Sequence, residues 1–136
     1  MNYSLDTSAV VALLRGRPAS ARRRLAEAVA SDATVAISSI VLFELWYGVA
    51  RSDARRVNAE RLRVFLAGNI VVMSFDDEDA ATAGHVRHVL ADVGIPIGPY
   101  DVMIAGQALR RGLTLVTAHV SEFGRVRGLA IEDWTG

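Results

Sequence analysis

The sequence contains no cysteine. This absence excludes disulfide bonds, thiolate metal sites and cysteine nucleophiles, and it fits a protein of the reducing cytoplasm. Lysine is missing as well, so all 15 basic residues are arginine. Guanidinium groups bind phosphate in a bidentate manner, although the wealth of arginine, alanine and valine also fits the codon usage of a GC-rich genome.

Neither sign of charge is in excess, because 15 acidic residues balance the 15 basic ones. The chain as a whole is therefore not drawn to nucleic acid or to a membrane, and contact with either has to rely on a local patch. The N-terminus has no basic stretch followed by a long apolar run, and the apolar window at 35–50 is too short to span a bilayer. We expect a cytoplasmic protein without a signal peptide or a membrane segment.

The sequence does have a high apolar content of 51% and a regular alternation of short apolar segments with helical ones. Its length predicts one domain, residues 1–136. We expect strands at 2–5, 34–37, 70–74, 114–116 and 128–133, and helices at 7–15, 19–30, 39–51, 54–66, 76–93 and 99–111. This alternation predicts an α/β fold with a parallel sheet, in which the functional site lies beyond the carboxyl ends of the strands.

Three acidic residues stand in apolar surroundings. Asp6 directly follows the first expected strand, Glu44 interrupts an apolar helix, and Asp101 opens another. An ionised carboxylate among apolar neighbours is costly unless it is paired or binds a metal. Carboxylates and water are the preferred ligands of Mg²⁺ and Mn²⁺, so the three acids together indicate a shared divalent cation. Such a site suits metal-assisted attack of water on a phosphodiester bond.

Taken singly, each of these acids also has a structural explanation. Asp6 could be a plain N-cap, and Asp101 a first-turn acid favoured by the helix dipole, as are the acidic residues at 76–79. Glu44 shares a helix face with apolar residues and is expected to point inward, although it could lie on the wet edge of the helix or pair with an arginine. Ser8, two residues beyond Asp6, could orient Asp6 or a bound water.

Segments spread in order over the whole chain resemble the PIN-domain ribonucleases and, among them, the VapC-type toxins. They are LDTSA at 5–9, FELWYG at 43–48, IGPYDVMIA at 97–105, LVT at 115–117, SEFGRVRGL at 121–129 and the ending IEDW at 131–134. The resemblance implies a three-layer α/β/α sandwich around a parallel sheet of about five strands. It also implies an endoribonuclease that uses Mg²⁺, for which Mn²⁺ could substitute.

The resemblance implies a biological setting too. VapC-type toxins are neutralised by a small antitoxin from the same operon, so we expect a cognate antitoxin as partner and RNA as substrate. We also expect a homodimer, and a heterotetramer or a larger assembly with the antitoxin. The apolar set Trp46, Tyr47, Val49, Ala50, Leu62, Phe65 and Leu66 is either a groove for an antitoxin helix or plain core.

The resemblance assigns catalysis and metal binding to Asp6, Glu44 and Asp101, which match the three central acids of the family. The fourth position departs from the family pattern. Many members carry Asn or Asp two residues after the threonine that matches Thr117, whereas this chain has His119. Imidazole is a poor ligand for Mg²⁺, which puts a second metal ion in doubt. Glu122 matches a further acidic position.

Arginines near the expected strand ends are candidate RNA contacts. Their loops should rim the acidic pocket and offset its repulsion of RNA; they are Arg15, Arg17, Arg125 and Arg127. The arginines at 22–24 and 55–56 are interpreted mainly as solvated helix faces. His85 and His88 are three residues apart on one helix, but without a third ligand a polar helix face is the better interpretation than a metal pair.

Two other protein classes with a similar sheet are excluded. A receiver domain needs a lysine near its last strand, and a haloacid-dehalogenase-type phosphatase needs a second aspartate two residues after the first, where this chain has Ser8. The remaining alternative is a non-catalytic PIN-like module that binds RNA or a protein partner, with a metal site impaired by His119. Transfer, ribosomal and messenger RNA are all open as substrates.

Overall fold

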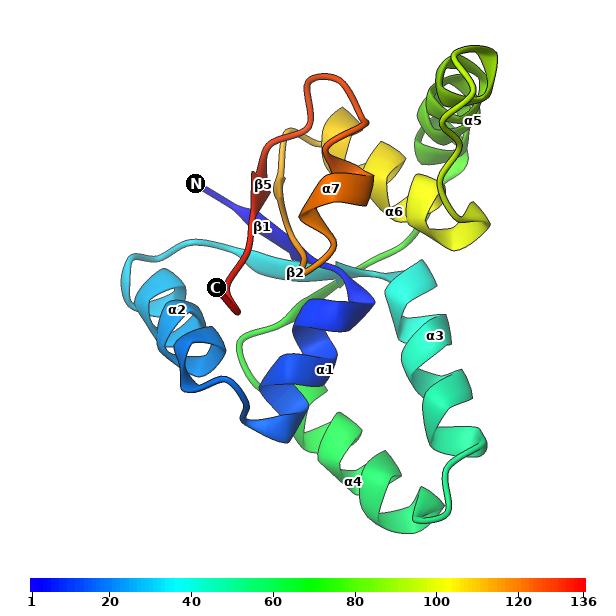
Figure 1. Cartoon of the computed structure of the whole chain (residues 1–136). Coiled ribbons are helices and arrows are strands. Elements are labelled where there is room, and N and C mark those ends of the chain that lie inside the picture. The colour runs from blue at the N-terminus through cyan, green and yellow to red at the C-terminus, as the bar shows by residue number, and fades with distance from the viewer.

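Five short parallel strands form a sheet in the order β3-β2-β1-β4-β5. In the computed structural model, which describes all 136 residues, they are β1 (Tyr3–Leu5), β2 (Val35–Ser38), β3 (Val71–Met73), β4 (Thr114–Val116) and β5 (Ile131–Glu132). The first strand is central, so the chain extends the sheet toward β3 and then crosses back to add β4 and β5 (Figure 1). The α/β fold with about five parallel strands is confirmed.

Helices flank this sheet and make it the middle of three layers. They are α1 (Thr7–Arg15), α2 (Ala19–Ala30), α3 (Ser39–Ala50), α4 (Arg55–Leu66), α5 (Asp77–Asp92), α6 (Pro99–Arg110) and α7 (Val120–Phe123). Figure 1 shows α1, α2 and α4 on one side of the strands and α5, α6 and α7 on the other, with α3 beside α1 and α4. No helix is both long enough and apolar enough to cross a membrane.

The predicted bounds of the first six helices agree with the structure to within one residue. Two features near the C-terminus were not predicted correctly. A short helix, α7, follows β4, and the last strand contains only Ile131 and Glu132 rather than all of 128–133. A helix of four residues has no hydrophobic period to reveal it; its position depends on Phe123, which is fully buried in the core.

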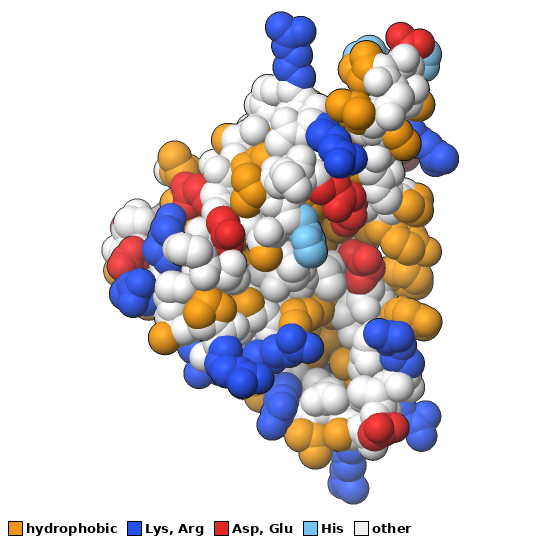
Figure 2. Space-filling model, viewed as in Figure 1, with side chains coloured by type: hydrophobic (Ala, Val, Ile, Leu, Met, Phe, Trp, Pro, Cys, Tyr) orange, Lys and Arg blue, Asp and Glu red, His pale blue; other side chains and the backbone are white.

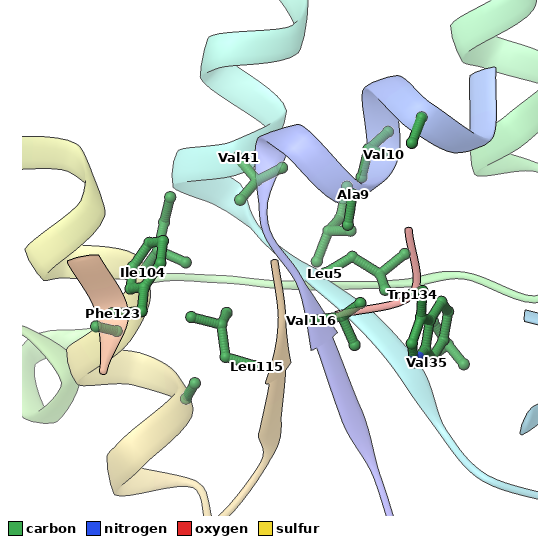
Figure 3. Packing of buried hydrophobic residues seen from close by; sticks show 14 of the residues in the cluster. Leu5, Ala9, Val10, Val35, Val41, Ile104, Leu115, Val116, Phe123 and Trp134 are labelled. Atoms are coloured by element: carbon green, nitrogen blue, oxygen red, sulfur yellow. The ribbon is translucent and has the colours of Figure 1, made fainter. Parts of the chain in front are cut away.

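The core lies on both faces of the central strands. Leu5, Ile37 and Leu115 are fully buried, as expected for parallel strands covered by helices on both sides. Figure 3 shows how the side chains around these strands pack. Trp134, near the C-terminus, is 2% exposed and meets the ring of Tyr3 edge-on, with 5.2 Å between the ring centroids. The end of the chain therefore closes the core beside the first strand.

The N-terminus of α5 is tied to the C-terminus of α6 by a buried carboxylate. Asp79 is fully buried, and its oxygens accept hydrogen bonds from Arg110 at 2.8 Å, Arg111 at 2.8 Å and the Gln107 amide at 2.9 Å. Burial opposes the ionisation of Asp79, but the hydrogen bonds from Arg111, the Asp76 backbone, Arg110 and Gln107 outweigh it and lower its pKa. The helix dipole was therefore an incomplete explanation for the acidic residues at 76–79.

The same two helices touch directly at Gly106. A Cβ atom built there would lie 2.6 Å from the Ala83 Cα atom and 2.9 Å from its backbone nitrogen, closer than such atoms can approach. Glycine at this position lets α5 and α6 pack with their backbones in contact. Because α6 begins with Pro99, Tyr100 and Asp101, this packing also fixes the element that carries the third acid.

We expect Gly106→Ala to destabilise the fold by about 1–3 kcal/mol, because the new methyl group forces the two helices apart. The matched control is Gly84→Ala on α5, where an added Cβ meets nothing within 4 Å. This second change should stabilise the protein by about 0.5–1 kcal/mol through its better helix propensity. Urea unfolding measures both free energies, and a destabilisation of the same size in the two variants would contradict the predicted contact.

Candidate active site

The candidate site lies at the carboxyl ends of the central strands. Asp6 follows β1 directly, and its backbone N–H donates to the Val116 carbonyl at the end of β4, at 3.0 Å. Thr117 follows β4 in the same way, and α3 begins where β2 ends. The parallel arrangement therefore gathers these positions at one edge of the sheet, as the sequence pattern indicated.

Asp6 is buried at this edge, with 3% of the residue exposed. Its Oδ1 atom accepts hydrogen bonds from the Ala9 backbone at 2.9 Å and from the Ser8 hydroxyl at 2.7 Å. The Ser8 oxygen in turn accepts from the Ala118 N–H at 3.1 Å, which ties the loop after β4 to the start of α1. Asp6 is thus an N-cap, but the cap uses one oxygen and leaves Oδ2 for another ligand.

Glu44 is linked to the residue that follows Asp6. This residue, Thr7, had been given no role from the sequence. The Thr7 hydroxyl donates to the Glu44 Oε1 atom at 2.6 Å, joining α1 to the middle of α3. Glu44 is half-buried, Val41 on the same helix face is fully buried, and Tyr47 is 61% exposed, so only part of the face that was expected to point inward does so. The fully buried residues of α3 are Val41 and Leu45. The position of Thr7, directly after Asp6, was the only sequence signal for its contact.

Asp101 stands in the first turn of α6 and meets the acid of α7. The Glu122 Oε1 atom accepts a hydrogen bond from the Gly98 N–H at 3.3 Å. A Cβ atom on Gly98 would lie 3.1 Å from the Asp101 Oδ2 atom, so glycine leaves room for the carboxylate. Asp101 and Glu122 therefore both lie against Gly98, the residue that precedes α6.

The pKa of Asp101 is raised by its neighbours in the site. Burial, a hydrogen bond with Glu122, and the charges of Glu122, Glu44 and Asp6 raise it from 3.8 to about 7. Asp6 and Glu44 are far from Asp101 in the sequence, yet they are near enough in the fold for their charges to act on it. No group of three acidic or histidine side chains is arranged to hold a metal ion directly. Mg²⁺ is usually bound through one or two carboxylates, with water as the other ligands.

A groove of about 750 Å³ opens beside these acids. Its lining includes Thr7 and Glu44, the exposed aromatic residues Phe43, Tyr47 and Tyr100, and the arginines Arg15, Arg51 and Arg61. Figure 2 shows acidic side chains gathered near the middle of this face, with arginines above and below them. The arrangement offers a negative centre for a cation and a positive surround for a phosphate chain.

The chain as a whole is similar to proteins of known activity. The chain is 38% identical to the tRNA(fMet)-specific endonuclease VapC of Shigella flexneri over 99% of both chains, and the PIN domain family matches residues 3–129. The chain belongs to the PIN-domain family of VapC-type ribonuclease toxins. It is therefore the toxin of a toxin–antitoxin pair.

Solved structures of VapC-type toxins share the whole fold. The chain superposes on the crystal structure of VapBC2 from Rickettsia felis bound to a promoter DNA fragment with a TM-score of 0.91, at 36% identity and with coverage of 98% of this chain and 99% of that one. DNA-bound VapBC from Salmonella typhimurium gives a TM-score of 0.90 at 37% identity, with 98% of each chain covered. Both of these relatives were solved as toxin–antitoxin complexes.

In this VapC-type toxin, the loop after β4 carries the departure from the family pattern. Thr117 is buried, and its hydroxyl accepts the His119 N–H at 2.9 Å, which shapes the turn into α7. His119 is exposed at the start of that helix. The other two histidines, His85 and His88, are exposed on α5 and belong to no metal-binding group.

The arginines named as candidate RNA contacts do not all lie beside the acids. Arg15 lines the groove beside Glu44, whereas Arg17 lines a separate groove. Arg125 donates to the Pro96 carbonyl at 3.2 Å, close to the loop that leads to Gly98, and Arg127 is exposed. Only some of the predicted rim therefore borders the acids.

The raised pKa of Asp101 predicts a pH dependence of stability. Since about 7 lies above the ordinary 3.8, the folded state binds more protons in this interval, and the stabilisation present below pH 4 is lost as the pH rises through 7. In EDTA, the melting temperature of the wild type should fall from pH 5 to pH 8. Asp101→Asn should remove most of this fall in melting temperature, whereas Asp77→Asn, on the exposed surface of α5, should not. If the melting temperature changes equally with pH in all three proteins, the raised pKa of Asp101 is contradicted.

Proposed function

We propose that this VapC-type toxin is a metal-dependent endoribonuclease of the cytoplasm, with residues 1–136 acting as a single PIN domain. Asp6, Glu44 and Asp101 are the catalytic residues and hold Mg²⁺, or Mn²⁺ in its place. The observation that carries the proposal is the raised pKa of Asp101, since burial and neighbouring carboxylates that oppose its ionisation also favour the binding of a cation beside it.

The donor set fits a hard divalent cation. It offers carboxylate oxygens, with no thiolate in the chain and no histidine pair at the site. Asp6 would hold the ion through Oδ2, because Oδ1 is already used by Ser8 and Ala9. When bound, the ion supplies positive charge to a phosphate oxygen and lowers the pKa of an attacking water.

The protein's own residues hold the carboxylates in place and transfer the protons of the reaction. The Thr7 hydroxyl fixes Glu44, so that its second oxygen can accept a proton from the attacking water. Ser8 keeps Asp6 in place, and Thr117 holds the turn that carries His119. With no lysine in the chain, the leaving 3′ oxygen takes its proton from solvent or from His119. The products carry 5′-phosphate and 3′-hydroxyl ends.

The substrate to test first is initiator tRNA, because a relative 38% identical over nearly the whole chain is named as specific for it. Purified toxin should cleave initiator tRNA in Mg²⁺ or Mn²⁺ and should not cleave it in EDTA. Elongator methionine tRNA serves as the matched RNA control. If the ions raise the melting temperature but no RNA in a total RNA extract is cut, the chain is the non-catalytic binding module instead.

The exposed apolar surface and the toxin–antitoxin complexes of the relatives support two protein partners, an antitoxin and a second copy of the chain. A cognate antitoxin neutralises the toxin in a heterotetramer or a larger complex. The homodimer forms through an apolar face of α3, α6 and the loop before α6, where Phe43 packs on Tyr100 with 5.5 Å between ring centroids and both rings are about half exposed. Figure 2 shows hydrophobic side chains along this edge. Light scattering at micromolar concentration should give twice the mass of 14.6 kDa, and a monomer would contradict the dimer.

A further inference from the structure

Two consecutive hydroxyl groups at the start of α1 each hold one acid of the site. The Ser8 hydroxyl donates to the Asp6 Oδ1 atom at 2.7 Å, and the Thr7 hydroxyl donates to the Glu44 Oε1 atom at 2.6 Å. Hydrogen bonds from a hydroxyl to an ionised carboxylate are about 2.5–2.7 Å long, so both distances fit charged acceptors. The first turn of α1 therefore orients the acid that precedes it and an acid of the neighbouring helix α3 (Figure 1).

Each hydroxyl engages one of the two oxygens of its acid. The Asp6 Oδ1 atom also accepts the Ala9 N–H at 2.9 Å, so both lone-pair positions of this oxygen are used. The Glu44 Oε1 atom is turned toward α1, because Thr7 is the protein donor to this carboxylate. The oxygens left for a cation or its water are Asp6 Oδ2 and Glu44 Oε2. Each of the two acids therefore presents a single oxygen to a cation.

The Asp6 carboxylate is fixed in this orientation. To offer both oxygens to one ion it would have to rotate and give up its hydrogen bonds with Ser8 and Ala9. Bonds to a charged acceptor are among the stronger ones, and Asp6 is only 3% exposed, so little water is at hand to replace the lost donors. Ser8 is itself held in place, because its oxygen accepts the Ala118 N–H at 3.1 Å.

A carboxylate that presents one oxygen suits some divalent cations better than others. Mg²⁺ demands a near-octahedral set of ligands at about 2.0–2.1 Å and keeps several waters, so one oxygen from each carboxylate is enough. Mn²⁺ also accepts an octahedral set of oxygen ligands. Ca²⁺ takes up to about eight oxygens at about 2.3–2.6 Å, which bidentate carboxylates help to supply. Holding one oxygen of each acid away from the ion therefore disfavours Ca²⁺ more than Mg²⁺ or Mn²⁺.

We propose that Thr7 and Ser8 are positioning residues that make the site selective for Mg²⁺ and Mn²⁺ over Ca²⁺. The inference rests on the proposed function, because it takes Asp6 and Glu44 as residues that hold the ion, and it adds the discrimination between ions. Neither hydroxyl is needed as a ligand, since each acts through the carboxylate oxygen that it holds. A purely structural role of the two hydroxyls would change the stability of the fold and leave the preference between ions unchanged.

The test is a competition between metal ions in the absence of RNA. Electron paramagnetic resonance gives the Kd of Mn²⁺, and displacement of the bound Mn²⁺ gives the Kd of Mg²⁺ and of Ca²⁺. We expect Thr7→Val/Ser8→Ala to weaken Mn²⁺ and Mg²⁺ about 10-fold, as is typical when a residue that orients a metal ligand is removed, without weakening Ca²⁺. The ratio of the Ca²⁺ Kd to the Mn²⁺ Kd should therefore fall about 10-fold. Thr7→Ser, which keeps a hydroxyl, should retain the wild-type ratio.

The matched control is Ser20→Ala, which removes a hydroxyl that donates to the Trp134 carbonyl at 3.0 Å, outside the site. The single variants Thr7→Val and Ser8→Ala are measured as well, and circular dichroism identifies the folded proteins. If the folded variants keep the wild-type ratio, lose affinity for all three ions equally, or change no more than the control, the inference is wrong. Wild-type protein that binds none of the ions would overturn the proposed function, whereas wild-type binding with an unchanged ratio in the variants overturns this inference alone.

Discussion

Replacing Asp101 by asparagine should lower the rate of RNA cleavage at least about 1000-fold, which corresponds to about 4 kcal/mol of transition-state stabilisation. The neutral amide removes a charge that balances the divalent ion, yet it keeps the shape of the side chain. The crowding of negative charge around Asp101 also disappears. The metal-free variant should therefore be at least as stable as the wild type at pH 8.

Asp6→Asn should give the same loss of cleavage. Asparagine keeps an Oδ1 atom that accepts from Ser8 and Ala9, and it is as good an N-cap as aspartate, so the fold should be preserved. The matched control is Asp77→Asn, an exposed acid in the first turn of α5, which should cleave at the wild-type rate. Single-turnover cleavage of initiator tRNA measures all three variants, and residual activity within 10-fold of wild type in either site variant would refute the assignment.

Replacing Asp79 by alanine should have the largest effect on stability. The change leaves Arg110, Arg111 and the Gln107 amide without their buried partner, which we expect to cost about 3 kcal/mol. For a chain of this length, that loss lowers the melting temperature by about 10 °C. Because the pKa of Asp79 is lowered, its contribution should be present at neutral pH and should be lost as the pH falls below about 4.

Glu78→Ala is the matched control for this prediction, because Glu78 also pairs with Arg110, at 2.9 Å, but is 79% exposed. An exposed ion pair contributes about 0.5 kcal/mol or less, so the melting temperature should hardly change. Thermal and urea unfolding at pH 7 and pH 3 measure both variants. Equal losses in the two variants, or a loss for Asp79→Ala that persists unchanged at pH 3, would show that the buried charge is not what stabilises the α5–α6 pair.

Much of the fold could be predicted from the sequence because its signals are local. Alternating apolar and helical segments predicted the six long helices to within one residue, and Asp6 does follow the first strand as predicted. The resemblance of scattered motifs then indicated the family, which the comparison with VapC relatives confirms. These features depend on period, spacing and residue type, all of which one sequence displays.

The features that were missed depend on contacts between distant residues. Thr7 binds Glu44 across 37 residues, and Asp79 is buried by arginines 31 and 32 residues away; neither contact has a local pattern. Glu44 was expected to point inward because its neighbours are apolar, but Phe43 and Tyr47 are themselves exposed.

Metal binding is the most direct test of the site. Electron paramagnetic resonance of Mn²⁺ at pH 7.5 should show that the wild type binds the ion, and binding should weaken as the pH falls below 7, since protonation of Asp101 removes a ligand. Asp6→Asn and Asp101→Asn should each weaken it at least about 10-fold, as expected when a charged ligand is lost. Wild-type protein that leaves millimolar Mn²⁺ free, or asparagine variants that bind it as tightly as the wild type, would contradict a cation site made by these converging acids.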